Sequence, residues 1–422
     1  MQDRPALFAS LFASLFTSVH RAWRRAYASW DAETQDVAEG SVHVRPISHV
    51  SRVPAEIAFA TPISASPTAA TGWLAQSLRV FARTGRNLAL QDYAVLAMQI
   101  VLTSDAMWRA HGLTAATARR QTAELLAGLV AGLLLTRGEL IVSKPLRALL
   151  YRVGLLGTLA GSYFLLRPVL FGLQPVLLDA KLIAIDDALF GQTPSVLLDP
   201  FVTPRTVEWF AFYYFGYFWL LCCYVMGTLF LDSGRRRYEL LLATALVVSI
   251  GHIGYTVVPG VGPHSWPQLS FSRVLIGGPW WNRVQIAVAD GGAQLDIFPS
   301  IHTALSALCA LHAFRYRNEA PMRWIWLPTL FAVANIVIAT VFLRWHYGID
   351  LIAGALLAAS AQAVAIRMWP REGARAQGSS KLQEVWEPFF PIEMEKHDRA
   401  WAVGLTCILV SVLVLFAAFG TN

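Results

Sequence analysis

The chain has 422 residues, of which 55% are hydrophobic and 14% are charged. Soluble domains carry about 25% charged residues, so this composition excludes an ordinary soluble protein and predicts an integral membrane protein. The net charge of +7 comes largely from arginines at the ends of apolar segments. Because membrane topology is encoded in this way, we expect no nucleic-acid binding.

Residues 1–90 are expected to form an amphipathic N-terminal helix followed by a linker. Phe8, Phe12 and Phe16 recur at helical spacing, and arginines come after them rather than before. This order favours a helix lying in the membrane interface, with a targeting peptide as the weaker alternative. From about 31 to 72 the sequence is rich in Ser, Pro, Ala and Thr without periodicity, which is typical of a linker.

Nine apolar segments follow, at 91–108, 121–136, 148–171, 207–232, 238–258, 297–315, 323–343, 346–367 and 400–419. Spanning a bilayer takes about 20 apolar residues, and the first two segments are short or interrupted, so the sequence leaves open whether both cross. We predict an all-α integral membrane protein with accessory helices at 91–147, a six-helix core at 148–368, a cytoplasmic linker at 369–399 and a C-terminal membrane helix at 400–422. A short helix is expected within 172–206.

Basic residues gather in the connections on one side of the predicted membrane, around 137–152, 235–237, 315–323 and 367–375. The positive-inside rule makes that side, and the N-terminus, cytoplasmic. The connections 172–206 and 259–296 then face the other compartment. Arginines in the connection 109–120 do not fit this pattern, which weakens the assignment of the first two segments only.

Two stretches carry the candidate chemistry: Asp296-Ile-Phe-Pro-Ser-Ile-His302 and Arg344-Trp-His-Tyr-Gly-Ile-Asp350. The 44 residues from His302 to His346 suffice for two membrane crossings and a turn, so both histidines are expected at one membrane face. His346 and Asp350 are four residues apart, so on a helix the carboxylate can hold one imidazole nitrogen and leave the other free.

The first stretch resembles the start of a helix that could bind an anion. Pro299 suits the first turn and Ser300 can cap it, leaving backbone N–H groups for a phosphate beside His302. Arg344 and Arg167 are candidates for completing this clamp. Two histidines and an anion site supply a nucleophile, an acid and charge stabilisation, which together favour phosphoryl transfer.

Other polar residues admit a functional and an ordinary interpretation. His264 follows a Pro-Gly turn and could reach a head group, or be a simple loop residue. Asp296 could meet a cationic or polyol head group, or be a helix N-terminal charge with no ligand. Asp186 and Asp187 are not joined by other ligands, and no Cys spacing indicates a metal site, so we expect no metal, cofactor or disulfide.

The FPSIH and HYGID stretches resemble the second and third motifs of the phosphatidic acid phosphatase type 2 superfamily, membrane enzymes with a six-helix core. The resemblance covers roughly 148–368 and implies metal independence. It also implies that His346 is the nucleophile that becomes phosphorylated. Asp350 would orient it and His302 would protonate the leaving group.

The sequence departs from the phosphatase pattern in its basic clamp. Where that pattern has a Lys seven residues before Arg167-Pro168 the chain has Ala160, and Ala339-Thr340 replace a Ser-Arg pair. Keeping the His, His and Asp without this clamp resembles the lipid phosphotransferase branch that includes inositol phosphorylceramide synthase. The stretches 185–191 and 340–346 are similar to bacterial members of that group, which implies a bacterial inner membrane with the site facing the periplasm or exterior.

The resulting hypothesis is a membrane enzyme that moves a phosphoryl head group, or phosphate, from a membrane phospholipid to a lipid or small alcohol acceptor. One alternative is a lipid phosphatase acting on a polyprenyl or glycerolipid phosphate. Another, from a different class, is an inactive lipid-binding scaffold or a transporter, which a large separation of the histidines would favour. The sequence does not identify the lipid donor, the acceptor or the oligomeric state.

Overall fold

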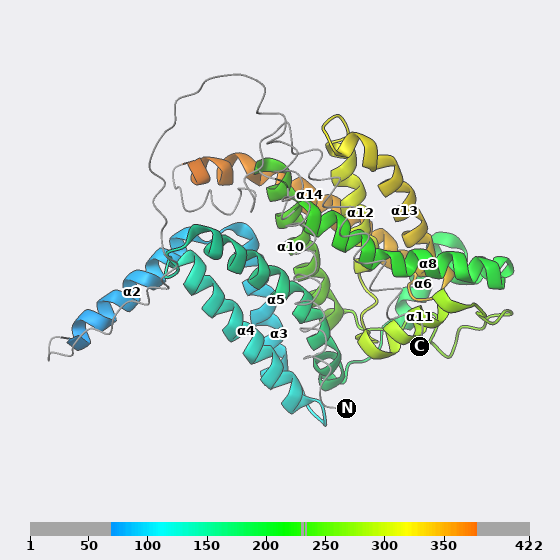
Figure 1. The fold of residues 1–422 in the computed structure, drawn as a ribbon. Coiled ribbons are helices and arrows are strands. Elements are labelled where there is room, and N and C mark those ends of the chain that lie inside the picture. The colour runs from blue at the N-terminus through cyan, green and yellow to red at the C-terminus, as the bar shows by residue number, and fades with distance from the viewer. Residues whose placement is uncertain (1–68, 229–231, 233, 378–422) are drawn as a thin grey trace, which may run out of the picture. The chain divides into compact units, whose positions relative to one another are not determined.

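The structure, a computed structural model, describes residues 69–228, 232 and 234–377. These residues are helical with connecting turns, which confirms the predicted all-α class (Figure 1). All but the first few of them belong to one compact unit, Phe81–Leu405. The predicted N-terminal amphipathic helix and C-terminal membrane helix lie outside the described residues.

Six long helices of the described chain make up the predicted core region. They are α5 (Lys144–Leu173), α8 (Pro204–Leu220) with its π-helical continuation η2 (Leu221–Met226), α10 (Gly234–Val257), α12 (Ile301–Arg315), α13 (Met322–Phe342) and α14 (Gly348–Gln377). All except α12 are long and apolar enough to cross a membrane, giving five candidate spans. With 15 residues, α12 is roughly 22 Å long, shorter than a hydrocarbon core of about 30 Å.

Three helices precede this core: α2 (Ala69–Asn87), α3 (Leu90–Trp108) and α4 (Ala115–Arg137). Of these, α3 and α4 match the first two apolar segments, although neither is among the five candidate spans. Within the predicted segment of helix and linker at 1–90, α2 fills 69–87. Helix α14 continues to Gln377, past the predicted end of the core at 368.

Short helices lie in the two long connections. The first connection holds α6 (Asp179–Phe190), α7 (Pro194–Leu197) and the 3-10 turn η1 (Asp199–Phe201), and the second holds α11 (Pro279–Gly291). The short helix expected within 172–206 is therefore confirmed as α6. It ends at Gly191, whose φ of 82° belongs to the left-handed region that glycine adopts at low cost.

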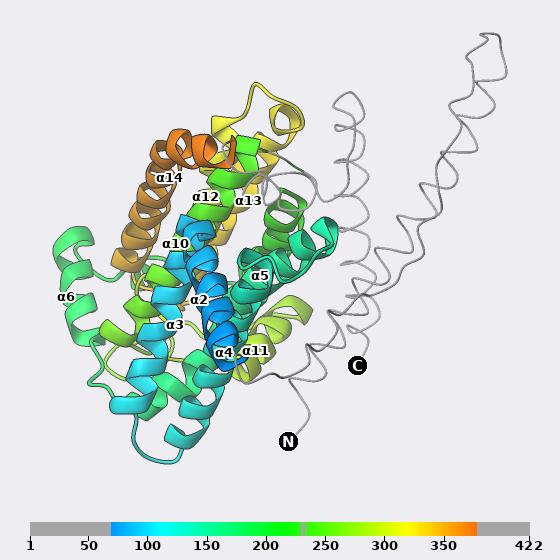
Figure 2. The same ribbon diagram turned by 90° about the vertical axis from the view of Figure 1, so that its left-hand side faces the viewer.

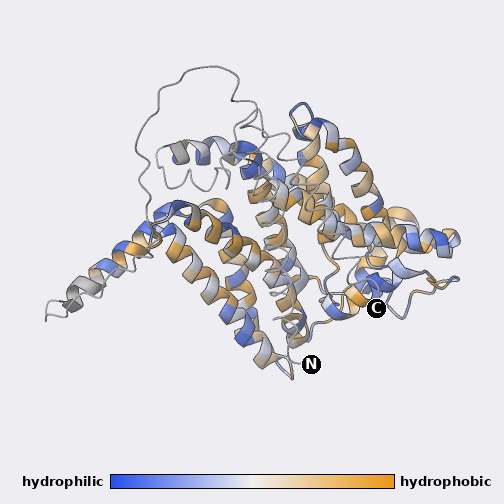
Figure 3. Ribbon diagram, viewed as in Figure 1, coloured by the Kyte–Doolittle hydropathy of each residue, from blue (hydrophilic) through white to orange (hydrophobic). Residues whose placement is uncertain are grey.

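The core helices are packed so that both candidate stretches meet at one end. Helix α12 contacts α10, α13 and α14, which lie close to one another in Figure 2. The connection between α12 and α13, hydrophilic in Figure 3, lies at the other end. Helices α12 and α14 approach closely at Gly354, where an added Cβ would lie 2.5 Å from the carbonyl oxygen of Ser300. The absence of a side chain there brings the starts of α12 and α14 together.

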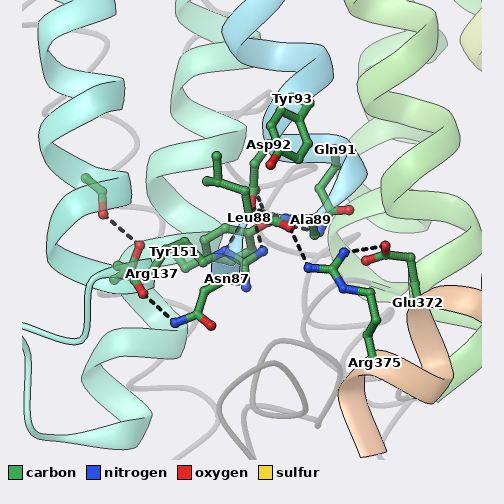
Figure 4. A network of polar contacts seen from close by, with 12 residues as sticks. Asn87, Leu88, Ala89, Gln91, Asp92, Tyr93, Arg137, Tyr151, Glu372 and Arg375 are labelled. Atoms are coloured by element: carbon green, nitrogen blue, oxygen red, sulfur yellow. Dashed lines mark hydrogen bonds and ion pairs between the residues drawn. The ribbon is translucent and has the colours of Figure 1, made fainter. Parts of the chain in front are cut away.

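A buried polar network joins α3, α4 and α5 (Figure 4). The Asp92 carboxylate accepts a hydrogen bond from Arg137 Nε at 2.8 Å and one from the Tyr151 hydroxyl. Arg137 also lies over the Tyr151 ring, with 4.2 Å from its Cζ to the ring centroid. Both charged side chains are buried, so each depends on the other for compensation.

We therefore expect Arg137→Met to destabilise the protein strongly, by about 3–5 kcal/mol, because it leaves the Asp92 carboxylate buried without its counter-charge. Thermal or denaturant unfolding of the full chain in detergent would measure this. The matched control is Arg120→Met, which breaks the exposed pair Arg120–Glu124, 4.0 Å apart. That change should cost at most about 1 kcal/mol, and equal losses in the two variants would contradict the prediction.

Candidate active site

His346 lies in the turn between α13 and α14, just before α14 begins. Its Nδ1 is 3.0 Å from the backbone carbonyl oxygen of Ile297 and 3.5 Å from Oδ2 of Asp350. A carbonyl can only accept a hydrogen bond, so Nδ1 carries the proton and Nε2 of the neutral ring has a free lone pair. The orientation expected from Asp350 alone is thus mainly provided by Ile297, and His346 precedes the helix rather than lying in it.

Asp350 occupies the third position of α14 and is fully buried. Its Oδ2 accepts the backbone N–H of Tyr347 at 2.8 Å, so the carboxylate caps the helix that it belongs to. The same oxygen faces Nδ1 of His346. Asp350 therefore combines a capping role with an electrostatic contact to the imidazole.

His302 lies near His346, with 6.1 Å between the two ring centroids. It occupies the second position of α12 and lies between two tyrosines of α8. The Tyr214 ring stacks on it with 4.7 Å between centroids, and the Tyr217 ring lies 4.3 Å away. These aromatic walls restrict how the His302 ring can turn. A phosphorus atom placed between the two imidazoles would be within reach of both.

The N-terminus of α12 has the serine cap that the sequence predicts, but Pro299 does not take its predicted place. The Ser300 hydroxyl accepts from the Thr303 backbone N–H, which confirms the cap. Pro299, however, precedes the cap instead of occupying the first turn, and the Phe298–Pro299 bond is cis. The Ser300 N–H donates to the Asp350 carbonyl oxygen at 3.1 Å, so it is already engaged. Any phosphate bound here would depend on the N–H groups that follow Ser300.

Arg344 is held in a buried ion pair beside the His346 turn. Its Nη2 donates to Asp199 Oδ1 at 2.7 Å and to the Arg273 carbonyl oxygen at 2.6 Å, while the guanidinium lies over the Phe271 ring. Burial alone would raise the pKa of Asp199, but hydrogen bonds from Ser272 and the Arg344 charge outweigh it and lower that pKa. In this structure Arg344 is thus committed to Asp199.

Arg167 and Asp296 lie near the same end of α5. The exposed Arg167 side chain donates to the Ala289 carbonyl oxygen at 3.1 Å, at the end of α11, rather than contacting either histidine. One turn earlier, the Tyr163 hydroxyl donates to Asp296 Oδ2 at 3.1 Å. Burial raises the pKa of Asp296, although the proximity of His346 opposes this shift. Asp296 therefore lies close to the nucleophile candidate, with Tyr163 as a partner.

The His264 ring lies against the Trp345 ring, with 4.8 Å between the ring centroids and 39° between the ring planes. Its backbone N–H donates to the Arg344 carbonyl oxygen at 2.7 Å, which joins the Pro-Gly turn to the His346 stretch. Desolvation, and then the Arg344 charge, lower the pKa of His264. A neutral imidazole is therefore favoured there, on a residue whose backbone is bonded to Arg344, two residues before His346.

Sequence reasoning missed several groups around the histidines. Tyr214 and Tyr217 were part of an ordinary apolar segment, and the Ile297 carbonyl has no side-chain signal at all. Asp199 and Asp186 were separated from their partners by more than 140 residues of chain. A helical spacing of three between the tyrosines was the one available sign that they share a face.

Among the described residues, no group of three or more His, Cys, Asp or Glu side chains is placed to hold a metal ion. The histidines have carbonyl, carboxylate and aromatic neighbours instead. The arrangement provides one imidazole with a free nitrogen and, beside it, a second imidazole that belongs to the first turn of α12.

Comparison with known proteins identifies a family for the part of the chain that holds this site. Residues 180–364 match the family model of the PAP2 superfamily. The match runs from α6 into α14 and includes both histidines and Asp350, while Arg167 lies outside it. No curated protein and no solved structure matched the chain. Residues 180–364 of this integral membrane protein are therefore a domain of the PAP2 superfamily, whose enzymes are phosphatases and phosphotransferases.

Proposed function

We propose that this protein is a lipid phosphotransferase that works through a phosphohistidine on His346 and uses an alcohol as acceptor. The observation that carries the proposal is the pairing of His346 with His302, 6.1 Å apart between ring centroids, with the Nδ1 proton of His346 bound by Ile297. That pairing supports one imidazole as nucleophile and the other as proton donor.

In the first half-reaction, Nε2 of His346 attacks the lipid phosphorus. A P–N bond forms, the P–O bond to the lipid breaks, and protonated His302 gives its proton to the leaving oxygen. The negative charge of the bound phosphate favours the protonated state of His302. In the second half-reaction the acceptor oxygen attacks phosphorus, the P–N bond breaks, and the acceptor proton goes to His302.

The remaining site residues have supporting roles in this proposal. Asp350 and Ile297 orient His346, and the backbone N–H groups at the start of α12 bind the phosphate. Asp296 and His264 lie where a donor head group would be expected, next to Tyr163 and Trp345 respectively. Arg344 would have to leave Asp199 to bind phosphate directly.

The branch within the superfamily rests on the sequence. Ala160 and Ala339-Thr340 remove basic groups that the phosphatase pattern carries, and this favours transfer to an alcohol over hydrolysis. The positive-inside pattern favours the extracytoplasmic face for both histidine stretches. Simple hydrolysis of a polyprenyl or glycerolipid phosphate is the second candidate function.

A product analysis tests this proposal. We expect the purified full chain, incubated with phosphatidylinositol, phosphatidylglycerol or phosphatidic acid, to form a new phospholipid only when ceramide, or a diacylglycerol whose acyl chains differ from those of the donor, is added. Mass spectrometry of the lipid extract would identify donor, acceptor and product. Release of free phosphate or head group at the same rate with and without acceptor would favour the phosphatase instead. No conversion of any donor would count against both.

A further inference from the structure

Helix α6 places two carboxylates against the histidine stretches. Asp179 and Asp186 are seven residues apart, so they lie two helical turns apart on one face, and both are fully buried. Asp187, the next residue, is exposed. Carboxylates are rarely fully buried unless they are paired. These two accept hydrogen bonds from backbone N–H and hydroxyl groups of segments far away in the chain.

Asp186 binds the start of α14. Its Oδ2 accepts the Gly348 N–H at 2.8 Å and its Oδ1 accepts the Ile349 N–H at 2.8 Å. With Asp350 taking the Tyr347 N–H, the first three N–H groups of this turn all donate to carboxylates. The α14 terminus is therefore filled from within the protein, and its position is set by a side chain of α6.

Asp179 binds the Pro-Gly turn and the same stretch from its other side. It accepts N–H groups of Val261 at 3.1 Å and Gly262 at 2.9 Å, and the Tyr347 hydroxyl at 2.8 Å. Gly262 has a φ of +78°, and an added Cβ would lie 2.5 Å from the Trp345 carbonyl oxygen. The turn is thus pressed against the residue that precedes His346, and it carries His264 two positions later.

We propose that Asp186 and Asp179 are positioning residues for the transfer reaction, with Asp186 placing His346 and Asp179 placing the His264 turn. The inference rests on the proposed function, which makes His346 the nucleophile. His346 lies two residues before the first N–H that Asp186 binds. A shift of about 1 Å in a reacting group can cost about 10²-fold in rate. By fixing the turn at Gly348 and Ile349, Asp186 therefore affects the rate of the chemical step.

The two carboxylates should therefore affect different kinetic constants. Loss of the Asp186 hydrogen bonds misplaces the nucleophile, which lowers kcat with little effect on donor binding. Loss of the Asp179 hydrogen bonds displaces the turn that carries His264 and contacts Trp345, which weakens donor binding and raises KM. If the two carboxylates contributed only to stability, replacing them would change neither kcat nor KM of the molecules that remain folded.

The test uses the full chain in detergent with a radiolabelled phospholipid that the wild type turns over. Asp186→Asn keeps the size of the side chain but turns an amide N–H toward a backbone N–H. We expect kcat per labelled site to fall by about 10²-fold with KM within about threefold of wild type. For Asp179→Asn we expect KM to rise by about tenfold, with kcat per labelled site within about threefold of wild type. Asp187→Asn, on the same helix, is the matched control and should resemble the wild type.

Counting labelled sites separates positioning from stability. If Asp186→Asn lowers the melting temperature and the number of labelled sites but leaves kcat per site unchanged, the inference is overturned. The same holds if Asp187→Asn loses as much as Asp186→Asn. Should Asp186→Asn fail to fold, Asp186→Glu keeps the charge with a longer reach, and its kcat per labelled site should fall below that of the wild type with KM within about threefold of wild type. Wild type that turns over donor without forming any label would instead contradict the proposed function.

Discussion

Replacing His346 with alanine is expected to abolish both lipid turnover and covalent labelling of the protein. Of the two ring nitrogens of His346, Nε2 is the free one, because Nδ1 is hydrogen-bonded to the Ile297 carbonyl oxygen. Without that nitrogen no P–N bond can form, so the loss should reach about 10⁴-fold or more in kcat. The measurement is acid-labile radiolabel retained on the denatured protein after brief exposure to donor.

His111→Ala is a suitable control for this experiment, because His111 is an exposed histidine between α3 and α4. It should keep both label and turnover. Label that persists in His346→Ala and disappears in His302→Ala would reverse the assignment of nucleophile and acid. Turnover without label in the wild type would indicate direct attack by the acceptor.

His302→Ala should be nearly inactive with ordinary lipids and recover part of its activity with a better leaving group. A general acid contributes about 10²- to 10⁴-fold, and that contribution matters only if the departing oxygen needs a proton. A phospholipid analogue with a nitrophenyl leaving group, which departs as the anion, therefore bypasses the acid. The ratio of wild-type to variant kcat should be much smaller for this analogue than for the natural lipid.

The matched control for His302→Ala is a change in Tyr217, whose ring lies against the His302 ring. Tyr217→Phe keeps the ring that lies 4.3 Å from the imidazole and should retain activity with both donors. An equal loss for good and poor leaving groups in His302→Ala would contradict the role of acid. A phosphate-binding or structural role at the start of α12 would then explain the loss.

The amino-acid sequence determined the helical architecture and singled out the candidate pair of histidines. Long apolar segments must satisfy their backbone groups internally in a membrane, so those that the structure describes were predictable as helices, although α14 continues past the predicted 367 to Gln377. The FPSIH and HYGID stretches, separated by two such helices, placed His302 and His346 at one end of the bundle. Local chemistry was also sufficient for the Ser300 cap, whose hydroxyl needs a partner only three residues away.

The tertiary structure alone decided what holds these residues in place. The Ile297 carbonyl that binds His346 is a backbone atom, and its direction follows from how α12 meets α14 at Gly354. Asp186 and Asp199 find their partners more than 140 residues away, a distance over which no spacing rule operates. The candidate catalytic residues leave a local pattern in the sequence, whereas the groups that contact them depend on packing between distant helices.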